Sequence, residues 1–167
     1  MKKQITFLSS IMAFMVLAAF TPISDVDGMV IGGHSDTGMV PLIRLATRNS
    51  IPVHTFLETA QLDEIVEQTK VGGATLTKLL GTSAWYAPGA AVSSMVQAIA
   101  CDQKKVFPCS VMLDGQYGFE DICLGVPVVI GKNGIEQIIE IELSPEEKTK
   151  MKDSADGVRS VNDLLQL

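Results

Sequence analysis

Residues 106–143, VFPCSVMLDGQYGFEDICLGVPVVIGKNGIEQIIEIEL, decide the fold of this chain. They contain three apolar runs, and the turn sequences DGQYG and GKNG separate each run from the next. The runs are VFPCSVML at 106–113, DICLGVPVVI at 121–130 and IEQIIEIEL at 135–143. Because short glycine-containing turns join antiparallel neighbours, the stretch predicts a three-stranded antiparallel meander.

Helical patterns lie on both sides of the meander. The sequence SPEE at 144–147 supplies an N-cap serine, a first-turn proline and two first-turn acids, which predicts a helix that reaches about Leu165. Upstream, apolar residues recur at spacings of three and four over 57–80, with the glycine pair 72–73 inside the pattern. A second helix is predicted from the Pro-Gly pair at 88–89. Together these elements give an α+β fold class.

The composition is that of one folded domain. The chain has 167 residues, of which 47% are hydrophobic and 19% are charged, an ordinary balance for a domain with a packed core. Its formal net charge is −6, and no cluster of basic residues appears along it. A nucleic-acid partner would need such a cluster, so nucleic-acid binding is not expected.

The first twenty residues, MKKQITFLSSIMAFMVLAAF, differ from the rest of the chain. Two lysines precede an uncharged apolar run and the small residues Ala18 and Ala19, which is the plan of a secretory signal peptide. The run Ile5–Phe20 is short of the roughly 20 residues that a membrane span needs, so no stable span is expected. A buried core helix is the alternative interpretation of the same run.

The three cysteines bear on location and on metal binding. Cys101, Cys109 and Cys123 form no CxxC pair and leave one thiol over if two were bridged. We expect free, buried thiols of a reducing compartment, which favours a cytoplasmic protein, whereas the signal-like residues 1–20 favour export. Their spacing does not fit zinc, so no metal is expected.

A candidate proton-transfer residue lies in VIGGHSDTGMVPL, residues 30–42. His34 stands where a strand pattern ends in glycines and a loop begins, and such exits from a rigid scaffold often carry reactive side chains. An imidazole can act as general acid and base near neutral pH. Ser35 and Asp36 cannot form a triad with it, because side chains of consecutive residues in an extended chain point to opposite faces. A structural role is the alternative interpretation of His34.

From about Pro22 to its end, the sequence resembles the C-terminal half of the NAD-dependent malate dehydrogenases of the lactate/malate dehydrogenase family. The resemblance rests on four motifs in the family's order: GGHSDTGMVPL, KVGGATLTKLLGTSAWYAPGAAV, FPCSV and GVPVVIGKNGIEQIIEIELSPEE. It implies that residues 21–167 form that family's C-terminal catalytic and substrate domain, an antiparallel strand meander packed with long helices. Residues 1–20 do not match the family.

The resemblance also implies an activity and a site. His34 would accept the hydroxyl proton of malate as NAD takes the hydride, and would return a proton to oxaloacetate in the reverse reaction. Gly33, Ala84 and Pro88 would line the substrate and cofactor pocket. Homo-oligomer formation and a cytoplasmic place in the tricarboxylic acid cycle follow from the same resemblance.

The sequence departs from the family in what it lacks. The glycine-rich NAD site, the arginines that clamp the substrate and the aspartate that orients the histidine belong to the family's N-terminal half. No GxGxxG follows a strand pattern here, so the main NAD-binding site is missing from this sequence. We therefore expect a truncated chain that needs a separate nucleotide-binding half. The alternative is a non-catalytic association domain, or an exported remnant that binds no cofactor.

Overall fold

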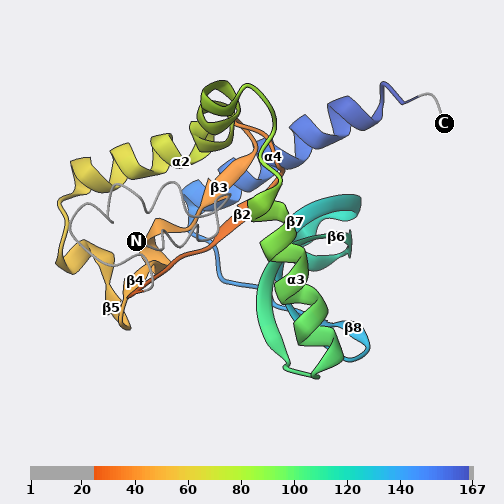
Figure 1. Ribbon diagram of the computed structural model, residues 1–167. Coiled ribbons are helices and arrows are strands. Elements are labelled where there is room, and N and C mark those ends of the chain that lie inside the picture. Colours follow the sequence, from red (N-terminus) through yellow and green to blue (C-terminus); the bar gives the residue numbers. More distant parts are fainter. Residues whose placement is uncertain (1–24, 166–167) are drawn as a thin grey trace. The chain divides into compact units, whose positions relative to one another are not determined.

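A computed structural model describes residues 25–165, so the signal-like segment predicted at 1–20 lies outside the described residues. The described residues form two compact units. The first comprises residues 25–29 together with Ile43–Val96, and the second comprises Val30–Leu42 together with residues 97–165. Figure 1 labels their helices and strands. Among the described helices, none has both the length and the apolar character needed to cross a membrane.

The first unit contains a small sheet and two long helices. Its antiparallel strands follow the order β1-β4-β5, with β1 at Val26–Asp27, β4 at Thr47–Arg48 and β5 at Ile51–Pro52. Short 3-10 turns lie at Ile43–Leu45 and Val53–Thr55. The helices are α2 at Thr59–Leu80 and α3 at Tyr86–Ala100, whose last residues belong to the second unit. The core of this unit gathers Ala46, Val53 and Leu62.

Both predicted helices of the first unit are present, for local reasons. A capping box between Glu58 and Gln61 begins α2, and Gly81 ends it with a left-handed φ of 70°. The glycine pair 72–73 lies within α2 and does not end it. Pro88 lies in the first turn of α3, where a missing amide proton costs no helical hydrogen bond.

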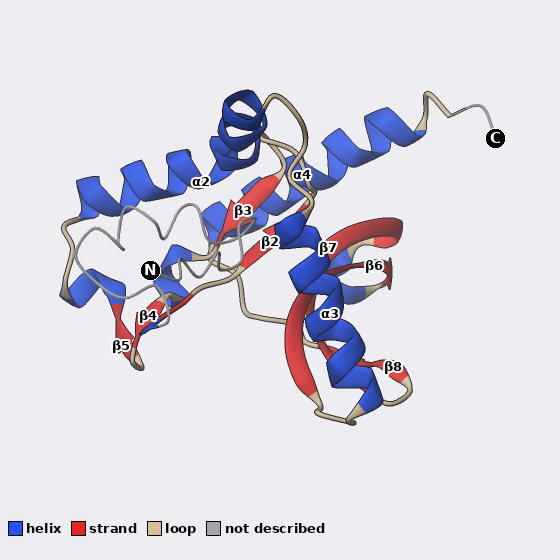
Figure 2. Cartoon of the chain, viewed as in Figure 1, coloured by secondary structure: helices blue, strands red, loops and turns tan. Residues whose placement is uncertain are grey.

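The second unit is built on the meander that the sequence predicts. Its strands are β2 at Val30–Gly32, β3 at Met39–Pro41, β6 at Lys105–Asp114, β7 at Glu120–Gly131 and β8 at Gly134–Ile138. All pairings are antiparallel in the order β3-β2-β7-β6, and β8 pairs with β7. Helix α4, Pro145–Asn162, packs against β2, β3 and β7 (Figures 1 and 2). The α+β class and the antiparallel meander are thus confirmed.

One strand prediction needs correction. The third strand of the meander ends at Ile138 instead of Leu143. The amide of Ile139 still donates to the carbonyl of Pro127 in β7, but the carbonyl of Ile139 and the amide of Ile141 bond to the Tyr117 hydroxyl and not to a strand.

The expectation that the cysteines are buried is wrong for two of the three. All three are free, but Cys101 and Cys123 are exposed and Cys109 is partly buried. Cys123 lies between the buried residues Ile122 and Leu124 of β7, so the alternation of strand side chains turns it to the opposite face. Partial burial raises the pKa of the Cys109 thiol.

Candidate functional site

His34 lies in the loop of residues 33–38, which connects β2 to β3 and is called the His34 loop below. Gly33 and Gly38 at its two ends are buried, whereas the four residues between them are exposed. The amide of Gly33 donates to the carbonyl of Gly38 at 3.1 Å, and the amide of Gly38 donates to the carbonyl of Ser35 at 3.0 Å. The loop therefore has a fixed, buried base and presents His34 at an exposed apex.

Glycines form this base because neighbouring backbone passes very close. Gly32 has a φ of 91°, and a Cβ there would lie 2.5 Å from the carbonyl oxygen of Gly38. A Cβ on Gly125 of β7 would lie 2.7 Å from the carbonyl oxygen of Gly32. On the other side, a Cβ on Gly33 would lie 3.0 Å from Cγ2 of Val158 on α4. Only residues without side chains allow this approach.

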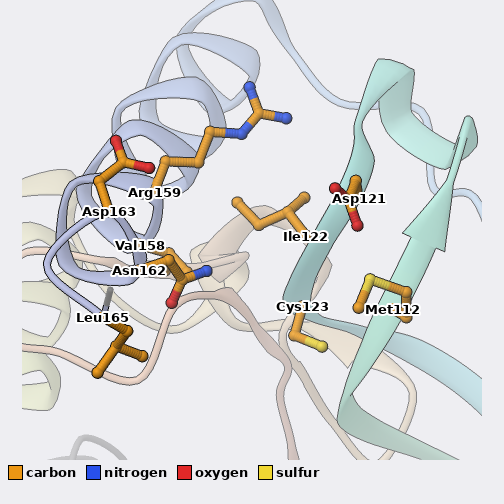
Figure 3. A pocket seen from close by; sticks show the side chains of 9 residues that line it. All are labelled: Met112, Asp121, Ile122, Cys123, Val158, Arg159, Asn162, Asp163 and Leu165. Carbon is orange, nitrogen blue, oxygen red and sulfur yellow. The ribbon is translucent and has the colours of Figure 1, made fainter. Parts of the chain in front are cut away.

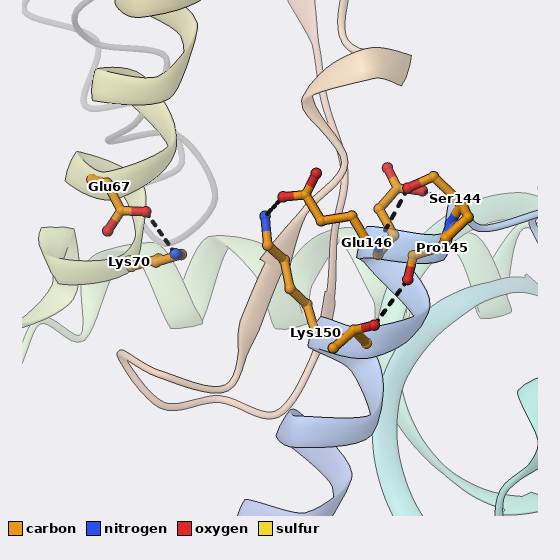
Figure 4. A network of polar contacts seen from close by, with 8 residues as sticks. Glu67, Lys70, Ser144, Pro145, Glu146 and Lys150 are labelled. Atoms are coloured by element: carbon orange, nitrogen blue, oxygen red, sulfur yellow. Dashed lines mark hydrogen bonds and ion pairs between the residues drawn. The ribbon is translucent and has the colours of Figure 1, made fainter.

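Helix α4 begins with the cap that the sequence predicts (Figure 4). The Ser144 hydroxyl accepts from the amide of Glu147 at 3.2 Å, and the Glu147 carboxylate accepts from the amide of Ser144 at 2.8 Å. Lys150 pairs with Glu146 at 2.6 Å, and the hydrogen bond from Lys150 lowers the pKa of the Glu146 carboxyl. These contacts fix the start of the helix and hence the positions of the residues that follow on it.

Ser154 of α4 reaches the base of the His34 loop. Its hydroxyl accepts from the amide of Gly33 at 2.7 Å and donates to the carbonyl of Gly38 at 2.7 Å. Sequence reasoning missed this residue, because its partners lie more than a hundred positions away. One local signal was available: Ser154 shares the buried face of α4 with Met151 and Ala155, and a polar residue on such a face needs a specific partner.

The His34 imidazole is open to a ligand. Within residues 25–165, no side chain holds it in a hydrogen bond or ion pair. The hydroxyl of its neighbour Ser35 accepts from the amide of Gly38 at 3.0 Å, so it serves the loop itself. This agrees with the exclusion of a triad with Ser35 and Asp36. The arrangement can transfer a proton to or from a substrate at the apex, provided that another group fixes the tautomer.

The other predicted pocket residues lie in two places. Gly33 is adjacent to His34 in the second unit, whereas Ala84 and Pro88 lie in the first unit, just before α3 and in its first turn. Ala84 is partly buried and Pro88 is exposed. Their role in a pocket stays a prediction. Among the described residues, no group of three or more histidine, cysteine or acidic side chains could hold a metal ion.

A crevice of about 590 Å³ lies beside the last turns of α4 (Figure 3). The meander contributes Met112, Asp121, Ile122 and Cys123, and the C-terminal part of the chain contributes Val158, Arg159, Asn162, Asp163 and Leu165. The guanidinium of Arg159 donates to the carbonyl of Glu120 at 3.0 Å. The charged side chains that line the crevice are of both signs, with Arg159 beside Asp121 and Asp163, so they select no single class of ligand.

Comparison with known proteins gives the family. The model of the lactate/malate dehydrogenase, alpha/beta C-terminal domain, matches residues 15–164. The chain belongs to this family. The predicted resemblance is therefore confirmed, and the His34 loop lies within the matched lactate/malate dehydrogenase domain.

Individual members of the family are similar along most of the chain. The malate dehydrogenase of Bacteroides fragilis is 59% identical over 143 residues, which are 86% of this chain and 46% of that protein. The structure of malate dehydrogenase from Salinibacter ruber is 43% identical with a TM-score of 0.88, covering 95% of this chain and 52% of that one. Lactate dehydrogenase from Eimeria maxima, solved with NADH and oxamate, is 38% identical with a TM-score of 0.89, covering 95% and 50%. The chain thus spans about half the length of the relatives it matches.

Proposed function

We propose that this chain carries the proton-transfer group of an NAD-dependent malate dehydrogenase, and that this group is the imidazole of His34. The observation behind the proposal is the exposed His34 on a loop whose two buried ends are hydrogen-bonded to α4. A catalytic group must be accessible to substrate while its backbone is held in place. We choose malate as the substrate because the relatives are named malate dehydrogenase.

In the proposed reaction His34 works in both directions. As malate is oxidised, the neutral imidazole accepts the proton of the hydroxyl group on the carbon that becomes the carbonyl of oxaloacetate. In the reverse direction the imidazolium donates that proton to the carbonyl oxygen. A neutral imidazole can accept a proton and an imidazolium can donate one, so one residue can serve both directions.

NAD is the proposed hydride acceptor. Binding of a dinucleotide phosphate needs a glycine-rich turn between a strand and a helix. Within residues 25–165 the glycine pair Gly72–Gly73 lies inside α2 instead. We propose that a separate nucleotide-binding half supplies this turn and the carboxylate that orients His34. Gly33, which directly precedes His34, would then lie on the substrate side of the pocket.

The test is to supply that half. The chain is co-expressed with the part of the Bacteroides fragilis malate dehydrogenase that it does not match, and NADH formation from malate is followed by absorbance. We expect activity that His34→Ala lowers by about 10²–10⁴-fold, the usual contribution of a general acid-base group. His54→Ala is the matched control, because His54 is an exposed histidine of the other unit. The absence of NADH formation, or equal activity of His34→Ala, contradicts the proposal.

A second candidate function is self-association without catalysis. Large apolar side chains are exposed at the end of α2, just before α3 and at its first residue, including Leu79 at 78%, Trp85 at 66% and Tyr86 at 74%. Exposed apolar groups in such numbers are typical of association surfaces. Sedimentation of the purified chain should then show a homo-oligomer, and NAD affinity in the micromolar range would contradict this candidate.

The compartment also remains a proposal. The free thiols and the family favour the cytoplasm, and the signal-like residues 1–20 favour export. The intact mass of the protein from its native cells separates the two. Loss of about the first 19 residues would indicate export through a cleaved signal peptide.

A further inference from the structure

The Ser154 hydroxyl of α4 links the two ends of the His34 loop by hydrogen bonds. It is the one side-chain group among the described residues that bonds to both ends of the loop, through the amide of Gly33 and the carbonyl of Gly38, each at 2.7 Å. Ser154 is only 2% exposed, so no water can replace these bonds without opening the packing. A hydroxyl has one proton to donate, and here that proton goes to Gly38.

The acceptor to which this hydroxyl donates is unusual for a serine within a helix. Serine and threonine inside helices commonly donate back to a carbonyl of the preceding turn, as Thr149 does to Pro145 and Ser160 does to Gly157 on the same helix. Ser154 instead donates to Gly38, on a different element of the fold. The contact thus belongs to the loop and adds no hydrogen bond to the helix.

We propose that Ser154 is a positioning residue for His34, which acts through the backbone on both sides of the imidazole. The inference rests on the proposed role of His34 in proton transfer. Gly33 directly precedes His34, so the hydrogen bond to its amide holds the Gly32–Gly33 peptide, one residue before the Cα from which the imidazole projects. A displacement of a catalytic group by about 1 Å can reduce a rate by about 100-fold.

The structure suggests a variant that removes this contact and keeps the fold. In Ser154→Ala the amide of Gly33 still has the carbonyl of Gly38 as acceptor at 3.1 Å. Alanine is also the residue that α-helices tolerate best, so α4 itself is not weakened. Ser160→Ala is the matched control, because Ser160 lies on the same helix and its exposed hydroxyl bonds only to Gly157.

The first measurement uses the whole chain and needs no activity. Amide hydrogen exchange is followed by NMR for Gly33 and for the strands β6 and β7, together with the chemical shifts of the His34 imidazole. Ser154→Ala should accelerate exchange at Gly33 by about 10-fold or more and shift the His34 signals, while strand amides stay unchanged. Ser160→Ala should leave all of them as in the wild type. Unchanged exchange at Gly33 in Ser154→Ala overturns the inference.

The second measurement uses the chain co-expressed with a nucleotide-binding half. Ser154→Ala should lower kcat by about 10- to 100-fold with a change in KM for malate of less than about 3-fold, because a mispositioned proton acceptor affects the transition state more than binding. A normal kcat in Ser154→Ala, where His34→Ala is impaired, overturns the inference and leaves the proposed function standing. A normal kcat in both variants overturns the proposed function itself.

Discussion

Two hairpin loops of the second unit each bond to a hydroxyl group that links separate segments of the backbone, but the hydroxyl lies outside the loop in one case and within it in the other. In the His34 loop the hydroxyl comes from Ser154 on a distant helix. In the turn of residues 115–119, between β6 and β7, it comes from Tyr117 within the turn. The difference teaches that an anchor from outside leaves the His34 side chain free for chemistry, whereas the turn that anchors itself uses the Tyr117 side chain for structure.

The sharpest way to test this difference is to add one methyl group beside the His34 loop, at Gly32 of β2, and one in the turn of residues 115–119, at Gly115. Gly32 and Gly115 have similar left-handed φ values of 91° and 96°, but only at Gly32 would an added Cβ have heavy atoms within 4 Å. We expect Gly32→Ala to lower the free energy of unfolding by about 2–4 kcal/mol, because strain adds to a clash with Gly38. Gly115→Ala should cost about 1–2 kcal/mol from backbone strain alone.

Urea denaturation of the whole chain measures both costs, with Gly134→Ala as a further control. Gly134 has a φ of 85° and no neighbour within 4 Å of a Cβ, so it should behave as Gly115 does. Equal losses of unfolding free energy in Gly32→Ala and Gly115→Ala would show that close packing around the His34 loop contributes nothing to the stability of the chain.

The second prediction breaks the self-anchored turn. The Tyr117 hydroxyl donates to the carbonyl of Ile139 at 2.8 Å and accepts from the amide of Ile141 at 2.9 Å. Burial raises the pKa of this tyrosine, so the hydroxyl keeps its proton at neutral pH. Tyr117→Phe should destabilise the chain by about 1–3 kcal/mol, since two part-buried main-chain groups lose their partner. His34 NMR signals should stay as in the wild type, and a shift in them would show that the two loops are coupled.

A smaller effect is expected at the start of α4, the helix that anchors the His34 loop. Ser144→Ala removes the acceptor for the amide of Glu147 and should lower stability by about 1 kcal/mol. Ser144→Asp, which keeps an acceptor at the cap, should restore it. Thermal unfolding of the chain measures the change, and a cost as large in Ser144→Asp as in Ser144→Ala would show that the cap hydrogen bond is not its source.

The smallest effect is expected for Asp102, at the end of the meander opposite the turn of residues 115–119. The amide of Lys132 donates to Asp102 at 3.0 Å, and Lys104 pairs with Asp102 at 3.2 Å and also with Glu136. The hydrogen bond from the Lys132 amide, followed by Lys104, lowers the pKa of the Asp102 carboxyl.

Because that pKa is lowered in the folded chain, the contribution of Asp102 to stability is present above the ordinary carboxyl pKa of about 4 and is lost as the pH falls below it. The group is exposed, so the loss should be small and should shrink further in high salt. An NMR titration of Asp102, with and without salt, checks the direction. Asp102→Asn should remove this part of the pH dependence. If the free energy of unfolding falls at acid pH in that variant just as in the wild type, the assignment to Asp102 is contradicted.

The meander and its neighbouring helices could be predicted because their signals are local. Glycine-containing turns, alternating apolar residues and the SPEE cap each act over a few positions, and the structure has β6, β7 and α4 where they indicated. The end of β8 could not be predicted in this way. A side chain of another turn, Tyr117, takes the main-chain groups at Ile139 and Ile141 that would have continued the strand.

The candidate site was half predictable for the same reason. Its glycines and its histidine stand together in the sequence, so the His34 loop could be recognised from residues 30–42. Ser154 could not, because it is separated from Gly33 by 121 positions and from Gly38 by 116. The burial of Cys123 was mispredicted because composition alone does not say which face of a strand a residue occupies.

The 121 positions between Gly33 and Ser154 determine when the contact between them can form during synthesis. Ribosomes deliver the N-terminal residues first, and a contact that spans most of a chain waits until its second partner emerges. The loop that carries His34 is synthesised early, but the hydroxyl that closes it arrives with the last helix. A nascent chain stalled before Ser154 would therefore display His34 on an unfinished loop, and maturation of the site would coincide with the docking of α4.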